Sequence, residues 1–222
     1  MRVALAILWK DLLTEWRSRD RVAAMLLFSL LVVAVFHFAL PGGTGKAQVV
    51  ENAPGLLWVA YIFAALLGLN RAFALELEND ALSGLALAPV SGGWLFLGKA
   101  LANFALISLV ELATAFAFAL VFDLDLFSIA LELAAVVALG TAGICGVGTL
   151  VSALAVRTRF SEVLLPVLLL PTLIPVLVGA VRGTAAVIAG EGVPFEAIQL
   201  LIVIDGTYWI VSFLAFDYVL DE

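Results

Sequence analysis

The amino-acid sequence predicts an all-α fold, a polytopic membrane bundle of six transmembrane helices. Hydrophobic residues make up 64% of the 222 residues and charged residues only 13%, whereas a soluble domain has about 45–50% and about 25%. The mean hydropathy is +1.19, and the apolar residues gather in runs long enough to cross a bilayer. A soluble core of this size could not bury so much apolar surface. We therefore expect one transmembrane domain over residues 1–222.

Six apolar segments are candidate spans, because each approaches or exceeds the about 20 residues that a membrane-crossing helix needs. They are 22–40, 54–70, 94–122, 128–156, 163–181 and 197–218. The third and fourth are longer than one bilayer thickness, so we expect their ends to protrude, to tilt or to lie in the interface.

The lysines and arginines near the span ends predict the orientation, since cytoplasmic loops are enriched in these residues. With a cytoplasmic N-terminus, nine of the 11 basic residues lie inside. They are Arg2, Lys10, Arg17, Arg19, Arg21, Arg71, Lys99, Arg157 and Arg159, against Lys46 and Arg182 outside. Both chain ends are then cytoplasmic, and the outside loops are 41–53, 123–127 and 182–196.

Composition and motifs exclude several classes of function. The net charge of −7 argues against a nucleic-acid partner, which needs a basic face. The single cysteine, Cys145, rules out an internal disulfide and a cysteine-rich metal site, and we expect neither a metal site nor a catalytic residue. No phosphate-binding loop is visible in the sequence. The energy for any transport must then come from a partner protein or from an ion gradient.

Residues 1–21 precede the first span and form a predicted amphipathic helix. The apolar face carries Leu5, Leu8, Leu12 and Trp16, and the other face Lys10, Thr14, Arg17 and Arg21. Such a helix lies in the inner membrane interface, with Trp9 and Trp16 at headgroup depth. Glu15 and Arg19 have the spacing of a helical ion pair. The segment either anchors the chain or also braces a cytoplasmic partner, and the sequence leaves both interpretations open.

Residues 71–93 form the longest internal loop, between the second and third spans. We expect a helix over 72–88 that bends at Gly84 and ends at Pro89, with Ser91 as the N-cap of the third span. The first half is acidic at Glu76, Glu78 and Asp80, and the second half is apolar at Leu82, Leu85 and Leu87. An apolar patch beside charges on a loop indicates a docking surface. The alternative is a solvated hairpin whose leucines dip into the membrane.

Three stretches carry a resemblance to a known family. They read LWKDLLTEWRSRDR at 8–21, PGLLWVAYIFAALLGLNRAFALELENDALSGLALAPV at 54–90 and LGKALANF at 97–104. The order Arg71, Glu76, Glu78, Gly84, Leu85, Pro89 and Lys99 resembles the loop of ABC-2-type permeases. The three stretches together, with the length and the six-span layout, resemble the B subunit of the cytochrome c maturation haem exporter (CcmB). The resemblance covers nearly the whole chain.

This resemblance implies an ABC-2 or type V exporter-like fold in which residues 1–21 are an elbow helix and 71–93 hold a coupling helix. Glu76, Glu78 and Asp80 would meet basic or polar residues of a separate cytoplasmic ATPase dimer, and Leu82, Leu85 and Leu87 would fill its groove. ATP and Mg would bind to that ATPase, and no cofactor to this chain. Haem would be handled by the complex, which includes a haem-handling membrane subunit, a periplasmic haem chaperone and a second permease half. The location would be the bacterial inner membrane.

Four ionisable residues lie in or near the predicted spans, where such groups are costly and often functional. Glu111 falls near mid-membrane, Glu132 and His37 near outer ends, and Asp205 within the last span. One interpretation is burial against Ser, Thr or backbone groups, or a protonated carboxyl. The other is a polar lining or a proton-coupled site.

The fourth span contains two rows of small residues, which let membrane helices approach closely. Ala142 and Gly146 belong to one row, and Cys145 and Thr149 to the other. We interpret Cys145 as a packing residue. Three prolines in the fifth span, Pro166, Pro171 and Pro175, predict kinks.

Two other functions stay open on the sequence. An ABC-2 permease for a drug or a lipid would keep the loop and lose the haem context. An ion-driven secondary transporter would use Glu111 or Asp205, although no repeat relates the two halves of the chain.

Overall fold

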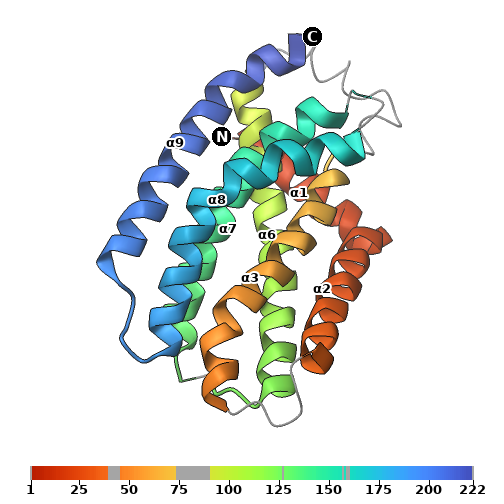
Figure 1. Cartoon of the computed structure of the whole chain (residues 1–222). Helices are drawn as coiled ribbons and strands as arrows, with labels where there is room; N and C mark the ends of the chain where they lie inside the picture. The colour runs from red at the N-terminus through yellow and green to blue at the C-terminus, as the bar shows by residue number, and fades with distance from the viewer. Residues whose placement is uncertain are drawn as a thin grey trace.

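The computed structural model describes residues 2–39, 46–73, 91–126, 128–156, 158 and 161–221. Those residues form seven helices in the order α1 (Arg2–Ser18), α2 (Asp20–Ala39), α3 (Lys46–Asn70), α6 (Gly92–Phe122), α7 (Ala130–Val156), α8 (Ser161–Ile188) and α9 (Phe195–Asp221). All but α1 are long and apolar enough to cross a membrane, which makes six candidate spans (Figure 1). The predicted all-helical, six-span membrane bundle is confirmed.

Two predicted outside loops are shorter than the sequence indicated. Helix α3 begins at Lys46, inside the loop predicted at 41–53, and α8 continues to Ile188, inside the loop predicted at 182–196. Hydropathy marks only the part of a helix that lies in lipid, whereas backbone hydrogen bonding continues as long as packing supports it. The last turns of α8 have such support, since the Trp58 indole N–H donates to Thr184 Oγ1 at 2.9 Å.

Helix α7 occupies the middle of the bundle, with α6 on one side and α8 and α9 on the other. Helix α3 packs against α2, α6 and α8. The glycines of α7 receive large side chains from these neighbours: a Cβ at Gly146 would lie 2.8 Å from the Trp209 indole. The close approach that small residues allow therefore brings α9 onto α7.

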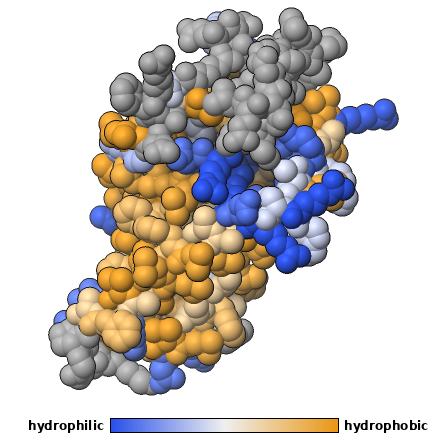
Figure 2. All heavy atoms as spheres, turned by 90° about the vertical axis from the view of Figure 1, so that its right-hand side faces the viewer, coloured by the Kyte–Doolittle hydropathy of each residue, from blue (hydrophilic) through white to orange (hydrophobic). Residues whose placement is uncertain are grey.

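The flank of the bundle is strongly apolar. Figure 2 shows an orange band of hydrophobic residues, with hydrophilic residues gathered toward the end where α1 lies. Exposed large apolar side chains come from several of the candidate spans and include Leu31, Phe38, Leu112, Leu120, Ile202 and Leu214. A soluble monomer rarely exposes an apolar surface of this kind, which instead suits contact with lipid or with another membrane protein.

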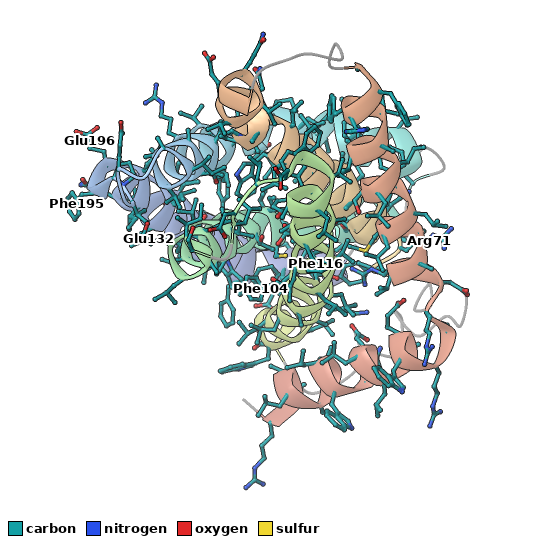
Figure 3. The ribbon with its side chains drawn as sticks, turned by 90° about the horizontal axis from the view of Figure 1, so that it is seen from below. Arg71, Phe104, Phe116, Glu132, Phe195 and Glu196 are labelled. Carbon is teal, nitrogen blue, oxygen red and sulfur yellow. The ribbon has the colours of Figure 1, made fainter. Side chains whose placement is uncertain are left out.

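Helix α1 has a different direction from the six candidate spans. Viewed along the bundle, it runs across the axis at one edge (Figure 3). It packs mainly against α6, and a short turn at Arg19 joins it to α2. A helix in this orientation at the end of a membrane bundle has the geometry of an interfacial helix.

Helix α8 continues through all three of its prolines, Pro166, Pro171 and Pro175. Each proline removes one backbone hydrogen bond and displaces the carbonyl four residues earlier. In Figure 1 the first turns of α8 run obliquely across the top of the bundle before the helix turns downward.

Candidate functional site

The loop that the sequence singles out is described at its two stems. Seven of the eight predicted docking residues lie outside the described residues: Glu76, Glu78, Asp80, Leu82, Leu85, Leu87 and Pro89. The eighth, Arg71, is exposed directly after α3, and Ala72 and Phe73 beside it are buried. The second stem begins at Ser91.

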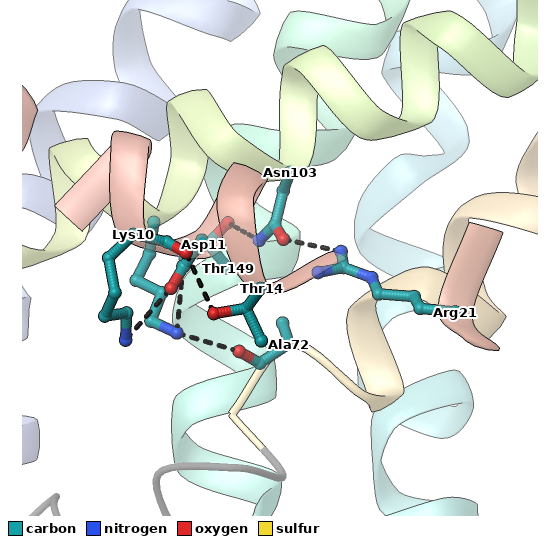
Figure 4. Close-up of polar contacts among 8 residues, drawn as sticks. Lys10, Asp11, Thr14, Arg21, Ala72, Asn103 and Thr149 are labelled. Carbon is teal, nitrogen blue, oxygen red and sulfur yellow. Dashed lines mark hydrogen bonds and ion pairs between the residues drawn. The ribbon is translucent and has the colours of Figure 1, made fainter. Parts of the chain in front are cut away.

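Lys99 of α6 holds the first stem in place. Its side chain is only 2% exposed, and Nζ lies 3.0 Å from Asp11 Oδ2 of α1. The same ammonium donates to the Ala72 carbonyl at 3.0 Å and lies 4.9 Å from the Phe73 ring centroid. A buried ammonium is tolerated when a carboxylate and further acceptors replace its hydration. One side chain thus joins α1, α6 and the root of the loop (Figure 4).

The backbone of α1 touches α6 directly at Gly98. A Cβ at that position would lie 2.7 Å from the Ala4 carbonyl oxygen and 2.8 Å from Ile7 Cβ. Glycine is the residue that allows this approach, because it leaves the space of a side chain to the neighbouring helix.

The face of α1 that packs on α6 differs from the predicted apolar face. Ala4 and Ile7 are buried, with Asp11 on the same side, whereas Leu5 is 56% exposed and Trp16 is 73% exposed. The helix therefore has a protein-facing side and a separate apolar side. Periodicity alone finds the larger apolar side and cannot tell whether lipid or protein covers it.

A second polar chain runs beside Lys99. Arg21 of α2 donates to Asn103 Oδ1 at 2.6 Å, and Asn103 Nδ2 donates to Thr149 Oγ1 at 2.9 Å. All three side chains are buried. The chain links α2, α6 and α7, so Thr149, predicted as a packing residue, is also a hydrogen-bond partner.

The turn between α1 and α2 corrects a predicted ion pair. The Val22 backbone N–H donates to Glu15 Oε1 at 2.9 Å. Arg19 has a left-handed φ of 58° after the end of α1, and its guanidinium lies 5.5 Å from the Trp16 ring centroid. The predicted Glu15–Arg19 ion pair is wrong, because the Glu15 carboxylate accepts from Val22 and the left-handed φ of Arg19 carries its guanidinium to the Trp16 ring.

The second stem is tied to α9. Ser91 occupies the N-cap position of α6, as predicted, but its side chain makes no capping hydrogen bond. The Gly92 N–H donates instead to Asp217 Oδ1. A carboxylate at a helix N-terminus satisfies a free N–H and interacts favourably with the helix dipole.

Sequence reasoning missed the residues that organise both stems. Lys99 contributed to the predicted orientation and to the family resemblance, but no partner was predicted for it, and no role was predicted for Asp11, Asn103 or Asp217. One signal was available: Lys99 lies well inside an apolar helix, where a charge needs a partner. The identity of that partner depends on how α1 folds back, which the linear sequence does not specify.

Two of the four ionisable candidates are deep inside the bundle. Glu111 is 1% exposed, and its Oε2 accepts a hydrogen bond from Thr141 at 2.6 Å. Asp205 is 7% exposed and lies against Gly143 of α7. Glu111 thus packs against a threonine as one of the two interpretations expects, and Asp205 has no such contact among the described residues.

The other two candidates lie at the end of the bundle opposite α1. Glu132 is exposed in the first turn of α7. His37 is exposed near the end of α2, with its ring 5.4 Å from that of Phe38 and 5.8 Å from that of Phe122. His37 and Glu132 lie near the ends of their helices. Glu111 and Asp205 lie near the middle of theirs, so the four residues do not form one site. Among the described residues there is no group of three or more potential metal ligands.

The small residues of α7 divide between two neighbours. Thr141 and Thr149 bond to α6, and Cys145 between them is fully buried. On the other face the Trp209 indole of α9 covers Gly146 and donates to the Ala142 carbonyl at 2.9 Å. The two rows hold α7 between α6 and α9.

Comparison with known proteins gives one consistent family. The model of the family described as CcmB protein matches residues 2–220. A protein named heme exporter protein B from Rhodobacter capsulatus is 34% identical over 174 residues, 78% of each chain. Proteins of the same name are 30% identical over 90% of each chain in Bradyrhizobium diazoefficiens, and 32% identical over 82% of this chain and 83% of the relative in Paracoccus denitrificans.

Proposed function

Because this chain belongs to the CcmB protein family, we propose that it is the permease subunit of an ABC transporter complex that exports or delivers haem for c-type cytochrome biogenesis. The observation that carries the proposal is the set of contacts that Lys99 makes with Asp11 and with the Ala72 carbonyl. These contacts join α1, α6 and the root of the loop at 71–93. A loop that received force from a partner would need stems that are bonded to the rest of the bundle, and each stem makes such a bond, through Lys99 and through Asp217.

Motion from an ATPase would enter at the loop and leave through its stems. The first stem passes force through the Ala72 carbonyl to Lys99, and from there to Asp11 of α1. The second stem passes force from Gly92 to Asp217 of α9. Charge-assisted hydrogen bonds hold a tighter geometry than neutral ones, so displacements at either stem would reach helices on opposite sides of the bundle.

The same proposal includes the partner proteins of the chain, its membrane and the side on which its termini lie. ATP and Mg bind to a cytoplasmic ATPase dimer that docks on 71–93, and haem is handled by the complex, with a haem-handling membrane subunit, a periplasmic chaperone and a second permease half. This chain has no catalytic role of its own. The membrane is the bacterial inner membrane, and both termini are cytoplasmic because nine of the 11 basic residues then lie inside.

Co-purification from membranes tests the proposal. We expect the ATPase to remain bound to the wild-type chain and to be lost from the triple variant Glu76→Lys, Glu78→Lys and Leu85→Asp. Glu196→Lys is the matched control, since Glu196 projects outward from the first turn of α9 at the opposite end (Figure 3). Haem delivery that continues unchanged in cells lacking the ATPase would contradict the proposal.

A further inference from the structure

Asp205 is a buried carboxyl in the middle of a candidate membrane span. It lies about 15 Å from the Phe195 end of α9, at 1.5 Å per residue. Its side chain is 7% exposed, and neither carboxylate oxygen has a hydrogen-bond partner among the described residues. Glu111 lies at a similar depth, about 16 Å from the Phe122 end of α6, but on the opposite side of α7.

Among the residues that the structure describes, none donates a hydrogen bond to Asp205. Its Oδ1 occupies the space that a Cβ at Gly143 would fill, and the two methyl groups of Val176 border the same space. The next three residues with hydrogen-bonding side chains on α9 bond elsewhere, and the Thr207 hydroxyl donates to the Val203 carbonyl at 2.8 Å. Tyr208 donates its hydroxyl to the Thr172 carbonyl at 2.5 Å, and Trp209 donates its N–H to the Ala142 carbonyl.

No cation faces this carboxyl from the described parts of the helices that pack on α9. Helix α7 presents Gly143, whereas its Cys145 lies on the row that faces α6. Helix α8 presents Val176, and its Arg182 is exposed more than a turn further along. Helix α6 meets α9 through Phe96, which contacts Trp209, and Glu111 of α6 bonds to Thr141 on the far face of α7.

An ionised carboxylate in such a place would lose its hydration without gaining a counter-charge. Removing the neutral acid from water costs much less free energy, because a dipole is buried and not a full charge. In a membrane the same preference is stronger, since lipid covers the flank of the bundle. The carboxyl is therefore stable there with a proton bound.

We propose that Asp205 is a proton-binding site in the seam between α7, α8 and α9. While the seam is open to water, a hydronium ion gives its proton to a carboxylate oxygen, so that one O–H bond breaks in the hydronium ion and one forms on Asp205. The proton stays bound while the seam is closed, and when the seam opens again the O–H bond breaks and water accepts the proton. Gly143 leaves the space that the carboxyl occupies, and Pro171 and Pro175 weaken α8 beside the seam. The chemical class of the ligand is the proton, and the site does not depend on the function proposed above.

Infrared spectroscopy of the full chain in lipid nanodiscs tests the site directly. At neutral pH we expect the carbonyl-stretch band of a protonated carboxyl, and we expect part of that band to disappear in Asp205→Asn. Glu132→Gln is the control, because Glu132 is exposed at the end of the bundle and lies away from the seam, so its replacement should leave the Asp205 part of the band unchanged. An identical band in wild type and Asp205→Asn would overturn the proposal.

A second variant keeps the test valid if Asp205→Asn does not fold. Val176→Thr has nearly the same shape and places a hydroxyl donor beside the carboxyl, which favours its ionised form. We expect the Asp205 part of the band to disappear at a lower pH than in wild type. Val167→Thr, which adds a hydroxyl on the exposed face of α8, should cause no such shift. Equal titration of the two variants would count against the site.

The pH dependence of unfolding supplies a thermodynamic readout. The native state would hold a proton that the unfolded state releases at neutral pH, so stability falls as pH rises. Relative to Asp205→Asn, the unfolding equilibrium constant of the wild type should rise by up to about tenfold per pH unit. Equal slopes would contradict the proposal. Failure of these tests leaves the ATPase co-purification untouched, so the two proposals fail separately.

Discussion

The buried polar residues at the α1 end of the bundle differ from those in its middle in whether they have partners. At the α1 end, the buried charge of Lys99 has a carboxylate and a carbonyl within 3.0 Å, and Arg21 bonds to Asn103. In the middle of the bundle, Asp205 has no hydrogen-bond partner among the described residues and Glu111 has one for a single oxygen. Paired buried charges fix the positions of the helices that carry them, whereas a carboxyl without a partner can gain or lose a proton. The first region suits the transmission of force and the second suits a change of state.

The largest expected effect is the loss of the Lys99 ammonium. Lys99→Met should destabilise the fold by about 3–5 kcal/mol, because it leaves the Asp11 carboxylate and the Ala72 carbonyl without a buried partner. The measurement is chemical unfolding in detergent, with protease cleavage at the α1–α2 turn as a local probe.

Lys10→Met is the matched control for that substitution. Lys10 binds the same Asp11 carboxylate at 3.0 Å, but its side chain is 53% exposed. An exposed ion pair contributes about 0–1 kcal/mol, so the two lysines should differ severalfold. Equal losses in the two variants would show that burial of Lys99 does not set the strength of the contact.

A methyl group at Gly98 should separate α1 from α6. The Cβ of Gly98→Ala would lie 2.7 Å from the Ala4 carbonyl, and overpacking of this kind costs about 1–3 kcal/mol. We expect faster proteolysis within α1 and weaker coupling between ATP hydrolysis and transport. Gly55→Ala is the control, because a Cβ there has nothing within 4 Å. Unchanged proteolysis of Gly98→Ala would show that α1 is not held at this point.

The Arg21–Asn103–Thr149 chain should contribute less than Lys99. Thr149→Val leaves Asn103 Nδ2 without its acceptor, at a cost of about 1–3 kcal/mol. Thr207→Val is the comparison, since the exposed Thr207 hydroxyl bonds to the Val203 carbonyl of its own helix. A double-mutant cycle with Asn103→Ala measures the coupling directly, and additive losses would contradict the bond.

The smallest effect is expected at the second stem. Asp217→Asn keeps an acceptor for the Gly92 N–H and removes the negative charge, which should cost about 0.3–1 kcal/mol at low salt. The loss should shrink as salt is added, because Asp217 is exposed and its charge is screened. A loss that is independent of salt would assign the effect to shape and not to charge.

The contrast between the regions also explains which parts were predictable. Long apolar runs define membrane helices whatever the tertiary fold, so the six spans follow from composition and length. Ser91 was predicted as the N-cap of α6 because cap signals are local. The residue that satisfies the Gly92 N–H is Asp217, over a hundred positions away, and no local rule identifies it.

The sequence by itself determined the class of the protein, the number of its spans and the family to which it belongs, because hydropathy and ordered motifs are properties of the linear chain. Only the tertiary structure decided that Lys99 has Asp11 and the loop root as partners, and that Asp205 faces Gly143 and Val176. The physical reason is that a buried charge is stable or costly according to the atoms that fold brings around it, and those atoms come from helices distant in sequence.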